Sequence, residues 1–432
     1  MKLPEKAPQK IKNSLVFLQN EETLRETIRK ANSEYLYWDR FKYLTLPKGV
    51  SPETAWGVLK IFRAVQFKIK SFAAKAFNYW LPDTAHAELH YIDQNASGQI
   101  LLDESGLYGS KDKYVISSLM DEAIASSLIE GAATTRLKAK EMLRTGRTPT
   151  NHAEKMIYNN YVTITKIKDT INEPLSPQLL KGLHRSMTGG TLDDPSQEGR
   201  FRKEDERIEV IDEEGRVLYV PPPATEVEDM VAALCDFANK DDKEFIHPVI
   251  KGILLHFWLS YIHPFIDGNG RTARALFYWY MLKRKYWLFE YLSISRTILR
   301  ARQQYYRSFL YTEMDDGDMT YFIMFHLHAI RLAINELLSD LREQQKELRS
   351  AVAHLSKYPH LNHRQRELLA HALKRPDAVY EIQNHMRIHG VVYQTARADL
   401  LELASIGLFK KVKRGRSFYF IPAGDFKERL SI

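Results

Sequence analysis

Hydrophobic and polar residues follow the helical period over most of this chain. Apolar residues recur every three to four positions in residues 22–38, 51–77 and 114–143, and again from 225 to about 349. Residues 90–103 instead mix apolar residues with Asn-Ala-Ser-Gly, which indicates extended chain with a turn. The pattern therefore predicts a mainly α-helical protein.

Two short segments have patterns typical of strands. In IEVIDEEGRVLYVPPP, residues 208–223, two β-rich runs flank Asp-Glu-Glu-Gly, which predicts a β-hairpin. In residues 361–421, three helical stretches precede two extended runs, LFKKVK and SFYFI, on either side of an Arg-Gly-Arg turn. The third stretch, residues 393–407, is expected to direct three leucines inward: Leu400, Leu401 and Leu403. This order of elements resembles a winged helix-turn-helix domain.

Length and charge divide the chain further. A chain of 432 residues is too long for one hydrophobic core. We expect an N-terminal helical region over residues 1–110, a larger helical core over 111–345 and a winged-helix domain over 355–432. Residues 351–432 contain 14 Lys and Arg against 7 Asp and Glu, whereas the rest of the chain is nearly balanced. Such a local surplus suits a polyanionic partner.

Cysteine content and hydropathy bear on the compartment. The single cysteine, Cys235, excludes an intrachain disulfide and favours a reducing environment. The longest apolar stretch, about residues 252–266, is too short to cross a bilayer. We therefore expect a cytoplasmic protein without a membrane span.

The stretch HPFIDGNGRTAR, residues 263–274, directly follows the most apolar helix of the chain. Pro264 is expected to end that helix, because the residue before a proline is driven out of the α region. The Gly-Asn-Gly sequence then allows a turn, and a second helix begins. The start of that helix offers unpaired N–H groups and a positive dipole end to an anion.

The side chains of this stretch suit phosphate chemistry. Arg271 and Arg274 are three residues apart and share a helix face, where they can bind a polyphosphate. Asp267 is a hard oxygen ligand for Mg²⁺, which prefers one or two carboxylates together with phosphate oxygens. His263 can take up a proton near neutral pH. A plain helix–loop–helix corner is the alternative, and six suitable residues among twelve argue against it.

At every fixed position this stretch resembles the motif HPFx(D/E)GN(G/K)RxxR of Fic-domain proteins. The resemblance covers roughly residues 115–330 and implies an all-helical Fic core that transfers AMP from ATP to a hydroxyl side chain (Ser, Thr or Tyr) of a target protein. It implies that His263 deprotonates the attacking hydroxyl and that Asp267 holds Mg²⁺ on the α- and β-phosphates. The nucleotide-binding residues would be Gly268, Asn269, Gly270, Arg271, Thr272 and Arg274, with the two arginines on the γ- and β-phosphates.

A second stretch, SSLIEG, resembles the inhibitory motif (S/T)xxxE(G/N) of Fic proteins. Ser126, Glu130 and Gly131 occupy the matching positions. The resemblance implies inhibition from within by an N-terminal helix. We expect the carboxylate of Glu130 to pair with Arg271 and to occupy the place that the γ-phosphate needs. A solvated helical glutamate is the alternative for Glu130 taken alone.

The resemblance also gives roles to the hairpin and to a tyrosine pair. Fic proteins have a β-hairpin flap that aligns a target segment by strand addition, which would place Val217, Leu218 and Tyr219 near nucleotide and target. Tyr305 and Tyr306 resemble the aromatic pair that lines the adenine site in many Fic proteins. A surface hairpin and a core tyrosine pair are the alternatives.

The basic C-terminal domain adds DNA as a candidate partner. In a winged helix-turn-helix domain the recognition helix enters the major groove and the wing contacts the backbone. The expected contacts are Gln394, Thr395, Arg397, Arg414 and Arg416. Docking to a protein is the alternative for this domain.

Three functions are therefore in competition. The first is an autoinhibited protein adenylyltransferase that uses ATP and Mg²⁺ and acts on a target protein. For its oligomeric state, a homodimer is left open. The second is a DNA-binding regulator whose Fic core senses nucleotide, against which the intact His263 and Asp267 argue. The third is a Fic enzyme with other chemistry: UMP or phosphocholine transfer, or AMP removal with Glu130 orienting water.

Overall fold

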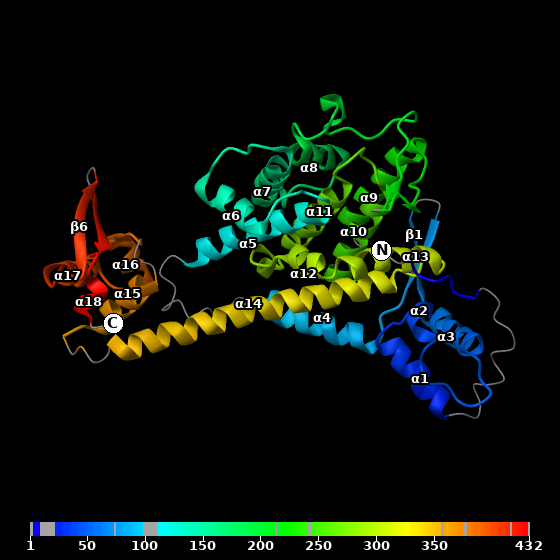
Figure 1. The fold of residues 1–432 in the computed structure, drawn as a ribbon, viewed down its shortest axis with the longest axis horizontal. Coiled ribbons are helices and arrows are strands. Elements are labelled where there is room, and N and C mark those ends of the chain that lie inside the picture. The colour runs from blue at the N-terminus through cyan, green and yellow to red at the C-terminus, as the bar shows by residue number, and fades with distance from the viewer. Residues whose placement is uncertain are drawn as a thin grey trace. The chain divides into compact units, whose positions relative to one another are not determined.

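The computed structural model describes residues 3–8, 22–72, 75–97, 110–212, 214–240, 244–355, 358, 360–374, 378–414 and 417–430. Two compact units divide the chain (Figure 1): Met1–Gly98 with Ser117–Ile334, and Gln99–Ile116 with Asn335–Ile432. Each unit has its own hydrophobic core. The described part is mainly helical with three small sheets, which confirms the expected fold class.

The N-terminal helices pack around an aromatic cluster. These helices are α1 (Glu22–Ser33), α2 (Trp38–Phe41) and α3 (Pro52–Gln66). Their core includes Trp38, Trp56 and Tyr321, the last from α14 (Thr320–Leu355). Arg63 is fully buried in this cluster and donates to Asn32 Oδ1 at 2.9 Å and to the Tyr321 hydroxyl at 2.8 Å. The hydrogen-bonded arginine fixes these helices against the start of α14.

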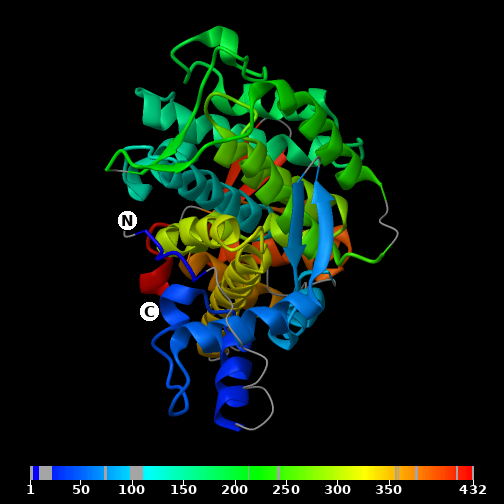
Figure 2. The ribbon, with the colours of Figure 1, turned by 90° about the vertical axis from the view of Figure 1, so that its right-hand side faces the viewer.

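Residues 51–77 were expected to form one helix, and that expectation is wrong. After α3, β1 (Lys68–Phe72) pairs antiparallel with β2 (Lys75–Tyr79), and Figure 2 shows this pair beside the central helices. The reason lies in the alternation of β2, whose Phe77 and Tyr79 are buried while Lys75 is exposed. Phe72 stacks on Trp258 of the central bundle with ring centroids 4.4 Å apart.

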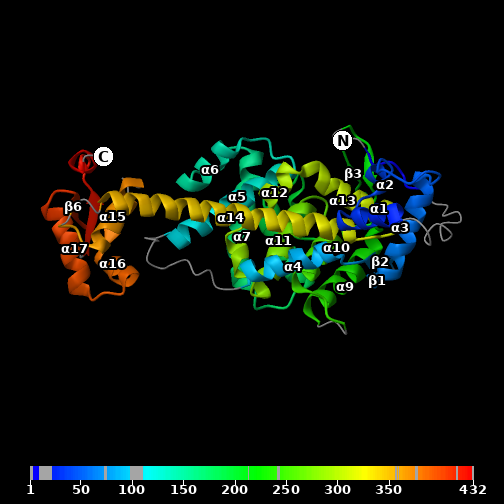
Figure 3. The same cartoon turned by 90° about the horizontal axis from the view of Figure 1, so that it is seen from below.

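The expected extended segment at residues 90–103 is also wrong in its first part. Helix α4 (Asp83–Ala96) covers residues 90–96, because Leu89, Ile92 and Ala96 bury one helical face. The remainder falls mostly outside the described residues. Figures 1 and 3 show α4 running beside α14, where Arg331 and Glu88 form an ion pair at 3.0 Å.

The central bundle is built around two consecutive buried helices, α10 (Pro248–Ile262) and α11 (Asn269–Lys283). Around them lie α5 (Ser110–Ile129), α6 (Arg136–Thr145), α7 (His152–Thr170), α8 (Pro177–Thr188), α9 (Val227–Asn239), α12 (Ile294–Arg300) and α13 (Arg302–Met314). The helix expected over residues 114–143 is interrupted, because Gly131 adopts a φ of +89° and Thr135 caps α6. Within the described residues, no helix has the length and apolarity that a membrane crossing requires.

The predicted hairpin is confirmed. Strand β3 (Val210–Ile211) pairs antiparallel with β4 (Val217–Tyr219), with a register shift between Val210 and Ile211. Short 3-10 helices at Pro195–Gln197 and Ala224–Glu226 lie before and after this hairpin, and a third spans Trp287–Glu290.

The second unit contains α15 (His363–Lys374), β5 (Tyr380–Glu381), α16 (Ile382–His389), α17 (Tyr393–Ser405), β6 (Phe409–Arg414), β7 (Ser417–Pro422) and α18 (Phe426–Arg429). The three helices and two strands expected here are confirmed, whereas β5 and α18 were not anticipated. The strands form an antiparallel sheet in the order β5-β7-β6. Leu400 and Leu403 are fully buried, and Leu401 is partly buried against the same core.

Candidate functional site

The turn between α10 and α11 begins with a histidine in the left-handed region. His263 has φ 49° and ψ 58°, and its N–H donates to the Leu259 carbonyl at 3.0 Å. Its Nδ1 lies 3.2 Å from the Ser260 carbonyl, which can only accept, so Nδ1 carries the proton and Nε2 is the basic nitrogen. Burial lowers the pKa of His263, which keeps the ring neutral and able to accept a proton.

Backbone contacts hold the rest of this turn. The Asn269 side chain accepts from Phe265 N at 3.0 Å and donates to Phe265 O at 2.8 Å. His184 lies 2.8 Å from the Asp267 carbonyl through Nε2 and accepts from Gly199 N at 3.0 Å through Nδ1. The His184 ring also stacks on Phe265 at 3.8 Å, and burial lowers its pKa to about 4. Contacts from α8 and from within the turn therefore hold its backbone in place.

A glycine is required where α11 begins. Gly268 has a φ of +78°, and a Cβ there would lie 2.8 Å from Thr188 Cγ2. The first turn of α11 therefore approaches α8 without an intervening side chain. The Thr272 hydroxyl, fully buried, donates to the Gly268 carbonyl at 2.8 Å and closes this turn from inside.

The two motif arginines have different partners. Arg271 is 1% exposed, with Nη2 3.3 Å from Asp267 Oδ2 and Nη1 donating to Met187 O at 3.3 Å. Its Nε has no hydrogen bond among the described residues. Arg274 donates through Nε to Ser126 Oγ at 2.9 Å and through Nη2 to Ser126 O at 2.8 Å.

Glu130 lies just after α5 and pairs with Arg274, not with Arg271 as expected from the sequence. Its Oε1 is 2.9 Å from Arg274 Nη1. Arg271 is directed instead toward α8 and Asp267, because successive motif arginines differ by about 60° around the helix. The Glu130 carboxylate also lies against the first turn of α11, since a Cβ on Gly270 would be 2.3 Å from Oε1.

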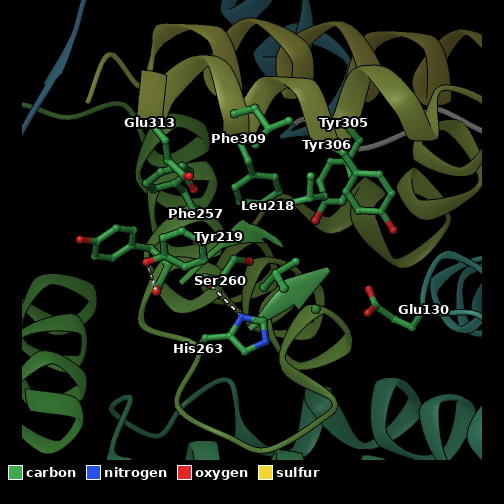
Figure 4. Close-up of a pocket in the computed structure, with 14 residues that line it drawn as sticks. Glu130, Leu218, Tyr219, Phe257, Ser260, His263, Tyr305, Tyr306, Phe309 and Glu313 are labelled. Carbon is green, nitrogen blue, oxygen red and sulfur yellow. Dashed lines mark hydrogen bonds between the residues drawn. The ribbon is translucent and has the colours of Figure 1, made fainter. Parts of the chain in front are cut away.

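Glu130 and His263 line a pocket of about 130 Å³, which is much larger than a single water needs. Figure 4 shows Glu130 and Glu313 at opposite ends, with His263 and aromatic rings between them. The hairpin contributes Leu218 and Tyr219, and the Tyr219 hydroxyl donates to the Tyr261 carbonyl at 2.7 Å. The other lining residues are Val210, Phe257, Ser260, Tyr261, Gly270, Tyr305, Tyr306, Phe309 and Leu310.

Comparison with known proteins identifies the central part of this site. A family model described as Fic/DOC family matches residues 174–281, which include the turn and both motif arginines. Residues 174–281 are a Fic domain. The rest of the chain lies outside this match.

Two curated relatives are similar to this chain over part of its length. A protein called protein adenylyltransferase Fic from Nematostella vectensis is 31% identical over 159 residues, which is 35% of this chain and 34% of the relative. A protein of the same name from Drosophila willistoni is 27% identical over 231 residues, or 50% of this chain and 41% of the relative. The matched parts thus span 34% and 41% of the lengths of these two relatives.

Solved structures support the fold. A Fic family protein from Desulfovibrio desulfuricans G20 superposes with a TM-score of 0.51 at 20% identity, covering 78% of this chain and 94% of that one. A Fic-1 variant from C. elegans superposes with a TM-score of 0.52 at 14% identity, covering 76% and 91%. At these identities the likeness concerns the fold alone.

Most of the residues expected at the site surround the Fic turn. The pocket is lined by the expected residues His263, Gly270, Glu130, Tyr305, Tyr306, Leu218 and Tyr219. Arg274 lies behind this lining, where it contacts Ser126. The Tyr306 hydroxyl donates to the Ile129 carbonyl at 3.2 Å, which ties α13 to the end of α5. Val217 is not among the pocket-lining residues, and its side chain is 47% exposed.

The expected DNA contacts belong to the second unit. Gln394 and Arg397 are exposed on α17, and Thr395 is partly buried. Arg414 is the last residue of β6, and Arg416 lies outside the described residues.

Three residues of the site escaped the sequence reasoning: His184, Arg202 and Glu313. His184 and Arg202 act on backbone carbonyls that are distant in sequence, so no local pattern reveals them. Glu313 follows Tyr306 and Phe309 at helical spacing, which is a signal that could have found it. Burial raises the pKa of Glu313 to about 7.

Proposed function

We propose that this chain transfers AMP from ATP to a hydroxyl side chain (Ser, Thr or Tyr) of a target protein and that Glu130 inhibits the transfer. The observation that carries this proposal is the position of the Glu130 carboxylate, which pairs with Arg274 at the start of α11. A carboxylate in that place occupies an anion site that a nucleotide phosphate would otherwise fill. The names of the two similar relatives also favour adenylyl transfer.

The proposed reaction is an in-line displacement at the α-phosphorus. The target hydroxyl oxygen attacks that phosphorus, the bond to the bridging oxygen of the β-phosphate breaks, and pyrophosphate leaves. His263 Nε2 accepts the hydroxyl proton, since Nδ1 already donates to Ser260. The N–H groups at the start of α11 and the guanidinium groups of Arg271 and Arg274 stabilise the phosphate charge. Such a transfer needs positioning more than covalent chemistry.

Asp267 fits the role of a magnesium ligand. Its side chain is 58% exposed, so its carboxylate can meet a hydrated ion, and it already lies beside the phosphate-binding Arg271. No group of three or more His, Cys, Asp or Glu that could hold a metal occurs in the described part of the chain. Mg²⁺ bound through one carboxylate and phosphate oxygens needs no such group. When bound, the ion would neutralise phosphate charge on the nucleotide.

The pocket walls provide the remaining contacts in this proposal. Tyr305 and Tyr306 on α13 form the wall on which the nucleobase stacks. Val217, Leu218 and Tyr219 form the flap strand along which the target segment adds. Val217 is exposed and open to a partner, whereas Leu218 and Tyr219 face the pocket.

The experiment that tests the function is incubation of the Glu130→Gly protein with labelled ATP, UTP and GTP. Label from ATP that stays with the protein after denaturation supports AMP transfer. Label from UTP alone assigns UMP transfer, and no label from any of them rejects nucleotidyl transfer. Asp121→Asn is a matched control, because Asp121 also lies on α5 and pairs with an arginine, Arg136, at 2.9 Å.

We further propose that the C-terminal part is a winged-helix domain that binds DNA. Its element order and the β5-β7-β6 sheet favour this assignment, and Gln394 and Arg397 are exposed at the start of α17. We propose that the chain is divided into an N-terminal helical region over residues 1–110, a Fic core over residues 111–345 and a winged-helix domain over residues 355–432. We also propose that the protein forms a homodimer and is located in the cytoplasm.

A further inference from the structure

Arg202 contacts backbone carbonyls that lie about 60 residues away in the sequence. It lies between the 3-10 helix Pro195–Gln197 and the hairpin and is only 7% exposed. Its Nε donates to the His263 carbonyl at 2.9 Å, and its backbone N–H donates to the Pro264 carbonyl at 2.9 Å. Its Nη2 lies 3.4 Å from the Ile262 carbonyl. Three consecutive carbonyls at the end of α10 therefore converge on one residue.

The physical need for this arginine comes from the way α10 ends. The last carbonyls of a helix have no partner within the helix, and the left-handed His263 followed by Pro264 prevents the chain from supplying one. A guanidinium group satisfies several carbonyls at once and complements the negative end of the helix dipole. Among the described residues no carboxylate forms an ion pair with Arg202, so its charge acts on these carbonyls.

The same guanidinium group also contacts the hairpin. Nη2 of Arg202 donates to the Pro222 carbonyl, three residues after the end of β4. A second tie joins the same regions, because Tyr219 of β4 donates to the Tyr261 carbonyl at 2.7 Å. One planar side chain thus bridges the hairpin and the turn that carries His263.

We infer that Arg202 is a positioning residue that couples the hairpin to His263, so that a target strand docked on the hairpin fixes the base in its reactive place. The inference rests on the proposed function. Arg202 lines neither the phosphate end of the pocket nor its aromatic wall. It therefore affects the rate of transfer without affecting nucleotide affinity.

The electrostatics of the turn support this role. The charged groups that act on His263 are Glu130 at the end of α5, Asp267 in the turn and Arg202 before the hairpin. The two carboxylates raise the pKa of His263, and the Arg202 charge opposes them, although burial is the largest cause of the lowered pKa. Arg202 thereby helps to keep the base neutral.

The test uses the full chain with Glu130→Gly as the active parent. Arg202→Lys keeps the charge and the backbone contact to Pro264, but a single ammonium group cannot span the three carbonyls of Ile262, His263 and Pro222 that the guanidinium group contacts. Arg200→Lys is the matched control, since Arg200 is two residues earlier and pairs with Glu206 instead. We expect Arg202→Lys to lower kcat by roughly 10- to 100-fold, because small misplacements of reacting groups are costly. We expect its Kd for ATP to stay within about twofold and Arg200→Lys to behave as the parent.

Hydrogen exchange provides a readout that does not depend on activity. Arg202→Lys should speed exchange together in peptides covering residues 208–223 and 261–267, and nowhere else. An unchanged kcat, or exchange that rises in only one of these segments or across the whole chain, overturns the coupling. If the parent transfers no nucleotide, the proposed function fails, and the exchange result alone then decides whether Arg202 couples the two segments.

Discussion

Replacing Glu130 by glycine should activate the protein. In the structure its carboxylate is 2.9 Å from Arg274 and lies against Gly270 at the start of α11. Under the proposed function, a bound nucleotide must displace this carboxylate from the guanidinium group and tolerate its negative charge. Glu130→Gly removes both obstacles and leaves the two Ser126 contacts of Arg274 in place.

The size of the effect follows from the geometry. Two unit charges about 4 Å apart interact by about 4 kcal/mol at an effective dielectric constant of about 20. The Glu130 side chain is 27% exposed while that of Arg274 is 3% exposed, so solvent screens part of this interaction and roughly 2–3 kcal/mol remains. Each 1.36 kcal/mol is tenfold in rate, and repulsion of the phosphate adds to the effect. Self-labelling should rise by roughly one to three orders of magnitude.

The assay is time-resolved incorporation of label from ATP, with a melting curve for each variant. Glu130→Gly should melt within a few degrees of the parent, because Glu130 lies after the end of α5 and is partly solvated. Arg274→Ala should not reproduce the activation, since it also removes a phosphate ligand, and the double variant should behave as Arg274→Ala. If Glu130→Gly labels itself no faster than the parent with any nucleotide, the inhibitory interpretation is wrong.

Three further predictions concern other parts of the chain. His263→Ala should abolish transfer in the labelling assay and leave the Kd for ATP, measured by calorimetry, within a few-fold of the parent value. Intact turnover in this variant would remove His263 from the mechanism. The full chain should retard duplex DNA, with affinity falling steeply between about 50 and 200 mM salt and weakened by Arg397→Ala; no retardation at low salt would indicate protein docking. Burial raises the pKa of Glu313 from 4.5 to about 7, so the folded state binds this proton more tightly than the unfolded state. The contribution of protonated Glu313 to the stability of the folded state is complete below about pH 4.5 and is lost as pH rises through about 7. Glu313→Gln should therefore flatten the fall in Tm between about pH 5 and 8, and an unchanged Tm profile would contradict the raised pKa of Glu313.

Local patterns predicted the elements that depend on neighbours in sequence. The buried rhythm of α10, the break at Pro264 and the hairpin at residues 208–223 each depend on residues a few positions apart, and all three are found. The same reasoning failed at residues 68–72 and 75–77, which were expected to continue a helix and form strands instead. The apolar residues Phe72 and Phe77 do not by themselves distinguish a strand from a helix. Both rings pack against Trp258, and this tertiary contact favours the strand pair.

The candidate site divides in the same way. Contacts inside the motif, such as Thr272 to Gly268 or Asn269 to Phe265, follow from spacing along one turn. The contacts of His184 and Arg202 reach the turn from more than 60 residues away, and only the packing of the helices brings them there. Sequence periodicity places a side chain on a face but does not say which helix lies opposite.

The pairing of Glu130 shows why this limit matters for mechanism. The sequence led to the expectation that Glu130 pairs with Arg271, whereas the position of α5 in the structure brings it to Arg274. Helix α5 carries Ser126, and Glu130 follows directly after its last residue, so both reach the same guanidinium group of Arg274. Arg271 is left with Asp267, the proposed magnesium ligand. In the proposed mechanism, the Glu130 contact blocks one arginine while the rest of the phosphate site stays formed, so we expect the release of this single side chain to be sufficient for activity.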